Sequence, residues 1–118
     1  MPVLRVSILR CPAELFPEVR RMMQDAEPIL RPGMEALPGF LSFYAGADEA
    51  ASSLTNVSFW TSLEAAKQMD SFQPMLDLAK PFMEMGATFE RPIMNYATLW
   101  QSPTASSKVA TPKRPLPA

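Results

Sequence analysis

Residues 54–61, LTNVSFWT, place an amide, a hydroxyl and an indole on one side of a predicted β-strand. Successive side chains of a strand point to opposite faces, so Asn56, Ser58 and Trp60 share one face and Val57 lies on the other. Three side chains with polar groups in a row are unusual on a sheet face that packs into a dry core. We therefore expect this face to border a cavity or water.

The chain of 118 residues contains no histidine. This absence removes the commonest general base near neutral pH, the usual proximal haem ligand and the ordinary imidazole metal ligand. Nucleophilic triads and zinc hydrolysis are disfavoured, and we expect no metal site. The single cysteine, Cys11, cannot form an internal disulfide, and beside Pro12 at a strand end it is interpreted as a small structural residue rather than a nucleophile.

The composition is that of a globular domain, with 47% hydrophobic and 19% charged residues. Residues 1–101 carry all 12 acidic residues but only 8 of the 11 basic ones, so this part has a net negative charge and no nucleic-acid footprint. No stretch approaches the ~20 apolar residues of a membrane span, and no secretory signal pattern is present. We expect a cytoplasmic protein that binds neither nucleic acid nor membranes.

Hydrophobic periodicity predicts a single domain over residues 1–101, followed by a flexible, basic, Pro/Ser-rich tail over residues 102–118. Alternating apolar residues mark four strands, and apolar residues at helical spacing mark two helices. The predicted order is strand 3–9, helix 13–31, strand 40–47, strand 54–61, helix 62–85 and strand 93–101.

Prolines predict interruptions in the two helices, and a capping pattern predicts where the second one begins. Pro28 should kink or end the first helix, and Pro74 and Pro81 should break the second into pieces, because each removes an internal donor. Thr61 is the predicted N-cap of the second helix, with Glu64 at capping-box spacing.

The order of elements is the split βαβ pattern of an α+β, ferredoxin-like βαββαβ fold with a four-stranded antiparallel sheet. Two helices can cover only one face of that sheet, yet both faces carry large side chains. We therefore expect a homodimer in which two sheets pack face to face.

Three segments, LPGFLSFYAG, NVSFWTSLEAAKQM and FERPIMNYATLW, resemble the antibiotic biosynthesis monooxygenase-like domains of the dimeric α+β barrel superfamily. The resemblance covers about residues 3–101. The superfamily includes cofactor-independent quinone-forming oxygenases, haem-degrading oxygenases, muconolactone isomerases and members with no known reaction. The haem-degrading branch needs a histidine on the second helix, which this chain lacks.

The resemblance implies catalytic roles for two residues. Trp60 occupies the strand-three tryptophan of the oxygenase branches, and Asn56 matches the asparagine that the quinone-forming branch pairs with it. Four strand residues span ~13 Å, so the two side chains could hold opposite ends of a flat polycyclic phenol. Lys80 takes the place of a basic residue, usually arginine, that stabilises the phenolate in that branch.

The resulting hypothesis is a monooxygenase without cofactors, acting on a small aromatic or polycyclic phenol in a cavity between sheet and helices. The first alternative is a non-catalytic module that binds a small apolar molecule in the same cavity, and the second is a structural role through dimerisation and the tail. Further residues that could line a pocket are Tyr44, Lys80 and Tyr96 as ligand-binding candidates, Asn95 as a secondary polar candidate, and Met69, Met75, Met83 and Met85 as adaptable apolar lining.

Overall fold

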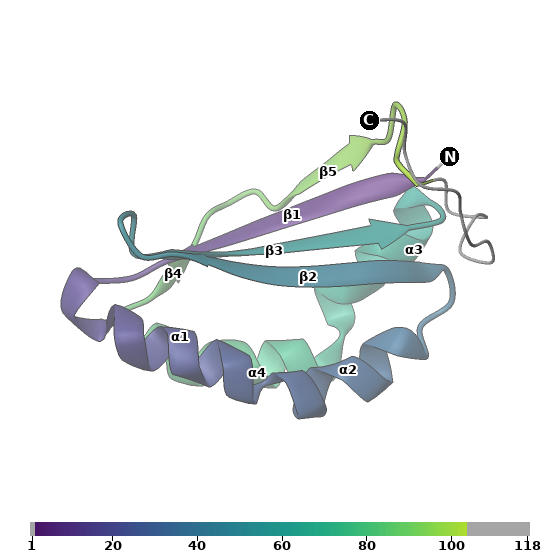
Figure 1. Ribbon diagram of the computed structural model, residues 1–118. Helices are drawn as coiled ribbons and strands as arrows, with labels where there is room; N and C mark the ends of the chain where they lie inside the picture. Colours follow the sequence, from purple (N-terminus) through teal and green to yellow (C-terminus); the bar gives the residue numbers. More distant parts are fainter. Residues whose placement is uncertain (1, 104–118) are drawn as a thin grey trace, which may run out of the picture.

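The computed structural model describes residues 2–103, which form one antiparallel sheet with helices on one face (Figure 1). The strand order is β2-β3-β1-β4, and β5 also pairs with β1. The strands are β1 (Val3–Arg10), β2 (Phe40–Asp48), β3 (Ser53–Trp60), β4 (Thr88–Phe89) and β5 (Met94–Ala97). This arrangement confirms the predicted α+β, ferredoxin-like fold.

The predicted fourth strand is divided into two. β4 pairs with Leu9 and Arg10 at the end of β1, whereas β5 pairs with residues 3–6 at its start, so both lie on the same edge of β1. The last strand ends at Ala97, which corrects the predicted end at residue 101.

Helices α1, α2 and α4 lie under one face of the sheet, and α3 lies near the end of β3 (Figure 1). The helical segments are η1 (Ala13–Leu15), α1 (Phe16–Asp25), α2 (Glu27–Glu35), α3 (Leu63–Lys67), η2 (Gln68–Ser71) and α4 (Gln73–Glu84). No helix of residues 2–103 is long and apolar enough to cross a membrane.

The prolines act partly as predicted. Pro28 lies in the first turn of α2, where the chain restarts after Ala26, so the expected interruption of the first helix is confirmed. Pro74 likewise lies in the first turn of α4. The prediction was wrong for Pro81, which lies inside α4 without breaking it, because the carbonyl it leaves unbonded belongs to Asp77 on the exposed side of the helix.

The N-cap of α3 is Ser62 rather than the predicted Thr61. The Ser62 side chain accepts a hydrogen bond from the backbone N–H of Ala65 at 3.1 Å. Thr61 is still part of the strand connection, because its N–H donates to the Gly39 carbonyl at 2.9 Å. A methyl group at Gly39, which has φ +80°, would lie 2.5 Å from Thr61 Oγ1, so only glycine permits this close approach.

The helix-facing side of the sheet is apolar at both ends and polar in the middle. One buried apolar cluster surrounds Trp60 and Val3, and a second surrounds Leu54 and Leu9. Between the two clusters, β1 and β3 contribute four polar side chains, which we call the polar quartet: Arg5, Ser7, Asn56 and Ser58.

No element of the described residues covers the opposite face of the sheet (Figure 1). We call this surface the open face. The pairing register places there the side chains of Leu4, Val6, Ile8, Tyr44, Val57, Phe59, Met94 and Tyr96. The expectation that both faces carry large apolar side chains is therefore confirmed.

The sequence of β2 predicts that Phe40 and Phe43 lie on opposite faces of the sheet, and this prediction was wrong at the start of the strand. The pairing register shifts between Phe40 and Ser42, so Phe40 lies opposite Trp60 and faces the helices together with Phe43. An irregularity of this kind inserts one residue and reverses the side-chain pattern before it. The predicted tail lies outside the described residues from residue 104 onward.

Candidate functional site

The polar quartet is fixed by the pairing of β1 with β3. Arg5 lies directly opposite Ser58, and Ser7 lies directly opposite Asn56. Residues that face each other across antiparallel strands have Cβ atoms about 5 Å apart. The guanidinium, two hydroxyls and an amide are thus gathered on one patch in the middle of the sheet.

A pocket of about 330 Å³ lies over the polar quartet, bounded by η2, α4 and the segment that carries β4. This volume is near the lower end of the range typical of small-molecule sites, ~300–1,000 Å³. Its polar lining is Arg5, Ser7, Asn56, Ser58, Asp70 and Arg91, and its apolar lining is Phe43, Met69, Met75, Leu76, Ala79, Phe89 and Ile93. An apolar wall with a few convergent polar groups is the pattern of a ligand site.

Asn56, which lines this pocket, carries an unsatisfied side-chain carbonyl. The residue is 8% exposed, and its Oδ1 is buried with no hydrogen-bond partner among residues 2–103. A buried polar atom without a partner costs about 1–3 kcal/mol. The fold therefore gains no hydrogen bond from this carbonyl, which supports a role in contacting a ligand.

Trp60 lies beneath the pocket rather than on its lining. Its side chain is fully buried, its ring makes an edge-on contact with Phe40, and its Nε1 donates to Ser58 Oγ at 2.8 Å. Because the Ser58 oxygen accepts this bond, the Ser58 hydroxyl hydrogen is free to donate into the pocket. The structure thus brings Asn56 and Ser58 to the pocket, with Trp60 acting on it through Ser58.

Arg5 is the pocket residue that sequence reasoning missed. Its side chain is 8% exposed, and Nη2 donates to Asp70 Oδ1 at 2.8 Å, whereas the Asp70 side chain is 62% exposed. The available signal was a charged residue at a position that alternates with Val3, Ser7 and Leu9 on one side of the first strand.

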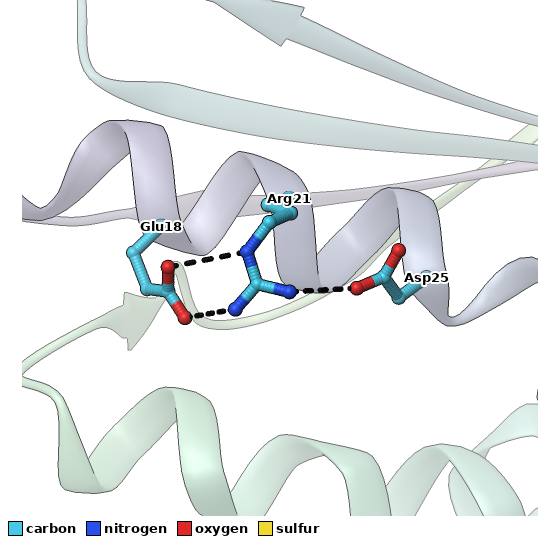
Figure 2. A network of polar contacts seen from close by, with 3 residues as sticks. All are labelled: Glu18, Arg21 and Asp25. Carbon is cyan, nitrogen blue, oxygen red and sulfur yellow. Dashed lines mark hydrogen bonds and ion pairs between the residues drawn. The ribbon is translucent and has the colours of Figure 1, made fainter.

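The other ion pairs of the described chain contrast with this one. In Figure 2, Arg21 on α1 bridges Glu18 and Asp25, with a distance of 2.8 Å from Nη1 to Asp25 Oδ2. There the arginine side chain is 57% exposed and the aspartate 66% exposed, so both charges are solvated. Arg5 alone among the arginines of the described ion pairs is removed from water.

Three predicted ligand-binding residues lie away from the pocket. Lys80 is exposed on α4 and is absent from the pocket lining. Tyr44 and Tyr96 lie on the open face, where both side chains are exposed. Any binding role for these three residues stays a prediction and would require a different surface.

Of the four methionines predicted to line a pocket, two do so. Met69 and Met75 line the pocket. Met83 is exposed on α4, and Met85 packs against the second apolar cluster. Asn95 lies opposite Arg5 on β5 but does not line the pocket.

A larger cleft of about 710 Å³ lies between β2 and helices α1 and α2. Its lining contains none of the catalytic or ligand-binding residues predicted from the sequence, and it includes both acidic and basic side chains. Phe43 lines both this cleft and the pocket, so one ring forms part of the wall between them. We assign the functional site to the smaller pocket because it holds the unsatisfied amide and the buried cation.

The described residues contain no cluster of side chains that could bind a metal ion. No group of three or more His, Cys, Asp or Glu side chains in residues 2–103 comes together as a metal site requires. The Cys11 sulfur contacts the Ser52 carbonyl, and burial raises the pKa of the thiol, which lowers the thiolate fraction at neutral pH.

The α+β architecture is that of proteins named antibiotic biosynthesis monooxygenases, as the sequence resemblance predicted. A candidate enzyme of this name from Deinococcus radiodurans has a TM-score of 0.65 and 14% identity, over 84% of this chain and 94% of that chain. One from Nitrosomonas europaea has a TM-score of 0.65 and 10% identity, over 87% and 93% of the two chains.

SnoaB, a cofactor-independent oxygenase from Streptomyces nogalater, has a TM-score of 0.57 and 17% identity, over 86% of this chain and 97% of its own. No model of a sequence family matches the chain, and no curated protein matches it in sequence. At such low identities the structural likeness establishes the fold and not the reaction.

Proposed function

We propose that this protein is a cofactor-independent monooxygenase that oxidises a small phenol in the pocket between the sheet and α4. The observation that carries the proposal is the buried Asn56 carbonyl, which has no partner among the described residues and belongs to a side chain that lines the pocket. The fold shared with SnoaB, itself named a cofactor-independent oxygenase, supports the reaction class.

The reaction needs no group beyond substrate and oxygen. An electron-rich phenolate gives one electron to O₂, and the resulting radical pair combines to form a carbon–oxygen bond. When the oxidised carbon is a ring CH₂, loss of water leaves C=O, so CH₂ and O₂ become C=O and H₂O. The substrate supplies all four electrons, which leaves the protein to bind, orient and desolvate it.

Several residues in and beside the pocket then have defined tasks. The Asn56 amide accepts from the phenol O–H or, after rotation, donates to the phenolate, since an amide offers both functions. Ser58 donates its hydroxyl hydrogen, and Trp60 holds that hydroxyl in orientation. Met69 and Met75 supply an adaptable apolar wall for the ring.

Oxygen consumption with a panel of hydroxylated anthrones and hydroquinones tests the proposal. We expect wild type to exceed the spontaneous rate, and Asn56→Ala to lose at least about tenfold in rate, because it removes a group aimed at developing charge. The melting temperature of Asn56→Ala should not fall, since its carbonyl makes no bond in the fold.

Thr98→Val is the matched control, because Thr98 Oγ1 is also buried without a described partner but lies outside the pocket. Its rate should equal that of wild type. No oxygen consumption by wild type with any compound, or equal losses in both variants, would remove the oxygenase assignment. Saturable binding without oxygen consumption would instead establish the non-catalytic alternative.

A further inference from the structure

We infer that the pocket selects an aromatic anion, whose negative group binds to Arg5 in place of the Asp70 carboxylate. The inference deepens the proposed function and rests on it for the identity of the pocket. It narrows the substrate class to a planar phenol that also carries a carboxylate, which is the group bound by Arg5.

The buried charge of Arg5 is poorly compensated. A guanidinium has five N–H donors, and Arg5 makes one hydrogen bond with side chains of the described residues, to Asp70. Buried charges in proteins are normally paired and fully hydrogen-bonded, because desolvation is costly. Arg5 therefore retains donor capacity within a cavity that a small molecule can enter.

Asp70, the partner of Arg5, is largely exposed to water. Its side chain is 62% exposed at the edge of the pocket, so water solvates much of its charge and the pairing with Arg5 is weak. A ligand carboxylate inside the pocket would meet the guanidinium in a less solvated setting, where charge-assisted and bidentate contacts are stronger. When the ligand carboxylate replaces the Asp70 carboxylate on Arg5, the Asp70 side chain remains solvated by water, which costs little free energy.

The charged residues that line the pocket are mostly basic. Arg5 and Arg91 face a single acid, Asp70, although the chain as a whole has a net charge of −1. Arg91 lies over the Phe89 ring, with its guanidinium carbon 5.9 Å from the ring centroid. The pocket lining, with two arginines and one aspartate, thus has a net positive charge in a chain of net charge −1, which favours anionic ligands.

Binding of 2-naphthoate, measured by isothermal titration calorimetry, tests the inference. The neutral isostere 2-naphthamide and the phenol 2-naphthol, which is largely neutral at pH 7, distinguish a carboxylate from a phenol as the anchored group. We expect 2-naphthoate to bind wild type at least roughly tenfold more tightly than 2-naphthamide, since hydrogen bonds to a charged group are the stronger ones. A preference for 2-naphthol that grows above its pKa would identify the phenolate as the anion instead.

Two variants locate the effect. Arg5→Gln should weaken 2-naphthoate binding roughly 10- to 100-fold and leave 2-naphthamide unchanged. Asp70→Asn should strengthen 2-naphthoate binding roughly two- to fivefold, because it removes the competing carboxylate. If Arg5→Gln fails to fold, Asp70→Asn decides alone, since Asp70 is on the surface.

Arg21→Gln and Asp25→Asn are the matched controls, because that pair has the same 2.8 Å distance but lies in neither cavity (Figure 2). Both should bind 2-naphthoate as wild type does. No preference for the anion, or unchanged or weaker binding by Asp70→Asn, overturns the inference. Anion binding without oxygen consumption leaves the inference standing and contradicts only the oxygenase proposal.

Discussion

The Trp60 indole N–H donates a 2.8 Å hydrogen bond to the hydroxyl of Ser58, two residues earlier on the same face of β3. Both side chains are buried, and only Ser58 reaches the pocket. The strand tryptophan therefore has a structural task, which is to orient a hydroxyl at the site.

Ser58→Ala should lower the free energy of unfolding by about 1–3 kcal/mol, because the Trp60 N–H would remain buried without a partner. Urea unfolding of Ser58→Ala, Trp60→Phe and the double variant measures this effect. In the Trp60→Phe background, Ser58→Ala should cost less, since no donor remains to be orphaned. Equal costs in both backgrounds would contradict the coupling.

Ser62→Ala should lower the free energy of unfolding by about 1 kcal/mol, because the side chain caps the Ala65 N–H at the start of α3. Thermal unfolding checks the expectation. Thr61→Ala, which changes the cap predicted from the sequence, is the control and should have a smaller effect. A larger loss of stability in Thr61→Ala than in Ser62→Ala would indicate that Thr61 is the N-cap of the helix.

Gly39→Ala should be strongly destabilising. The residue has φ +80°, and an added Cβ would lie 2.5 Å from Thr61 Oγ1 and 2.6 Å from the Ala65 Cβ. Strain and overlap together should cost more than about 1 kcal/mol. Gly46→Ala in β2 is the control, because its Cβ would meet only the Thr55 carbonyl at 4.0 Å, and chemical denaturation should show nearly wild-type stability.

If the protein forms the homodimer expected from its sequence, Val57→Lys should convert it into a monomer, because Val57 lies on the open face between Val6 and Tyr44 of the neighbouring strands. A lysine there would be buried in the proposed interface but solvated in a monomer. Size exclusion with light scattering at micromolar concentration measures the state. Ile29→Lys, which replaces an exposed residue on α2, is the control and should remain dimeric. A monomeric wild type would contradict the expected homodimer with its two sheets packed face to face.

Local patterns in the sequence predicted most of the strands and the polar face of β3. Alternation around Asn56, Ser58 and Trp60 identified the correct side, because a period of two needs no knowledge of partners. Arg5 was missed because its burial depends on pairing with β3, more than fifty residues away. Likewise, Tyr44 and Tyr96 have suitable side chains for a site, and only the sheet register shows that they face away from the pocket.

Phe43 has a consequence for how this fold could diversify. Its ring contributes to the walls of both the 330 Å³ pocket and the 710 Å³ cleft beside it. A small residue at that position would join the two spaces without altering any strand, helix or polar contact of the site. The size of the ligand that the protein accommodates should therefore depend on the side chain at position 43.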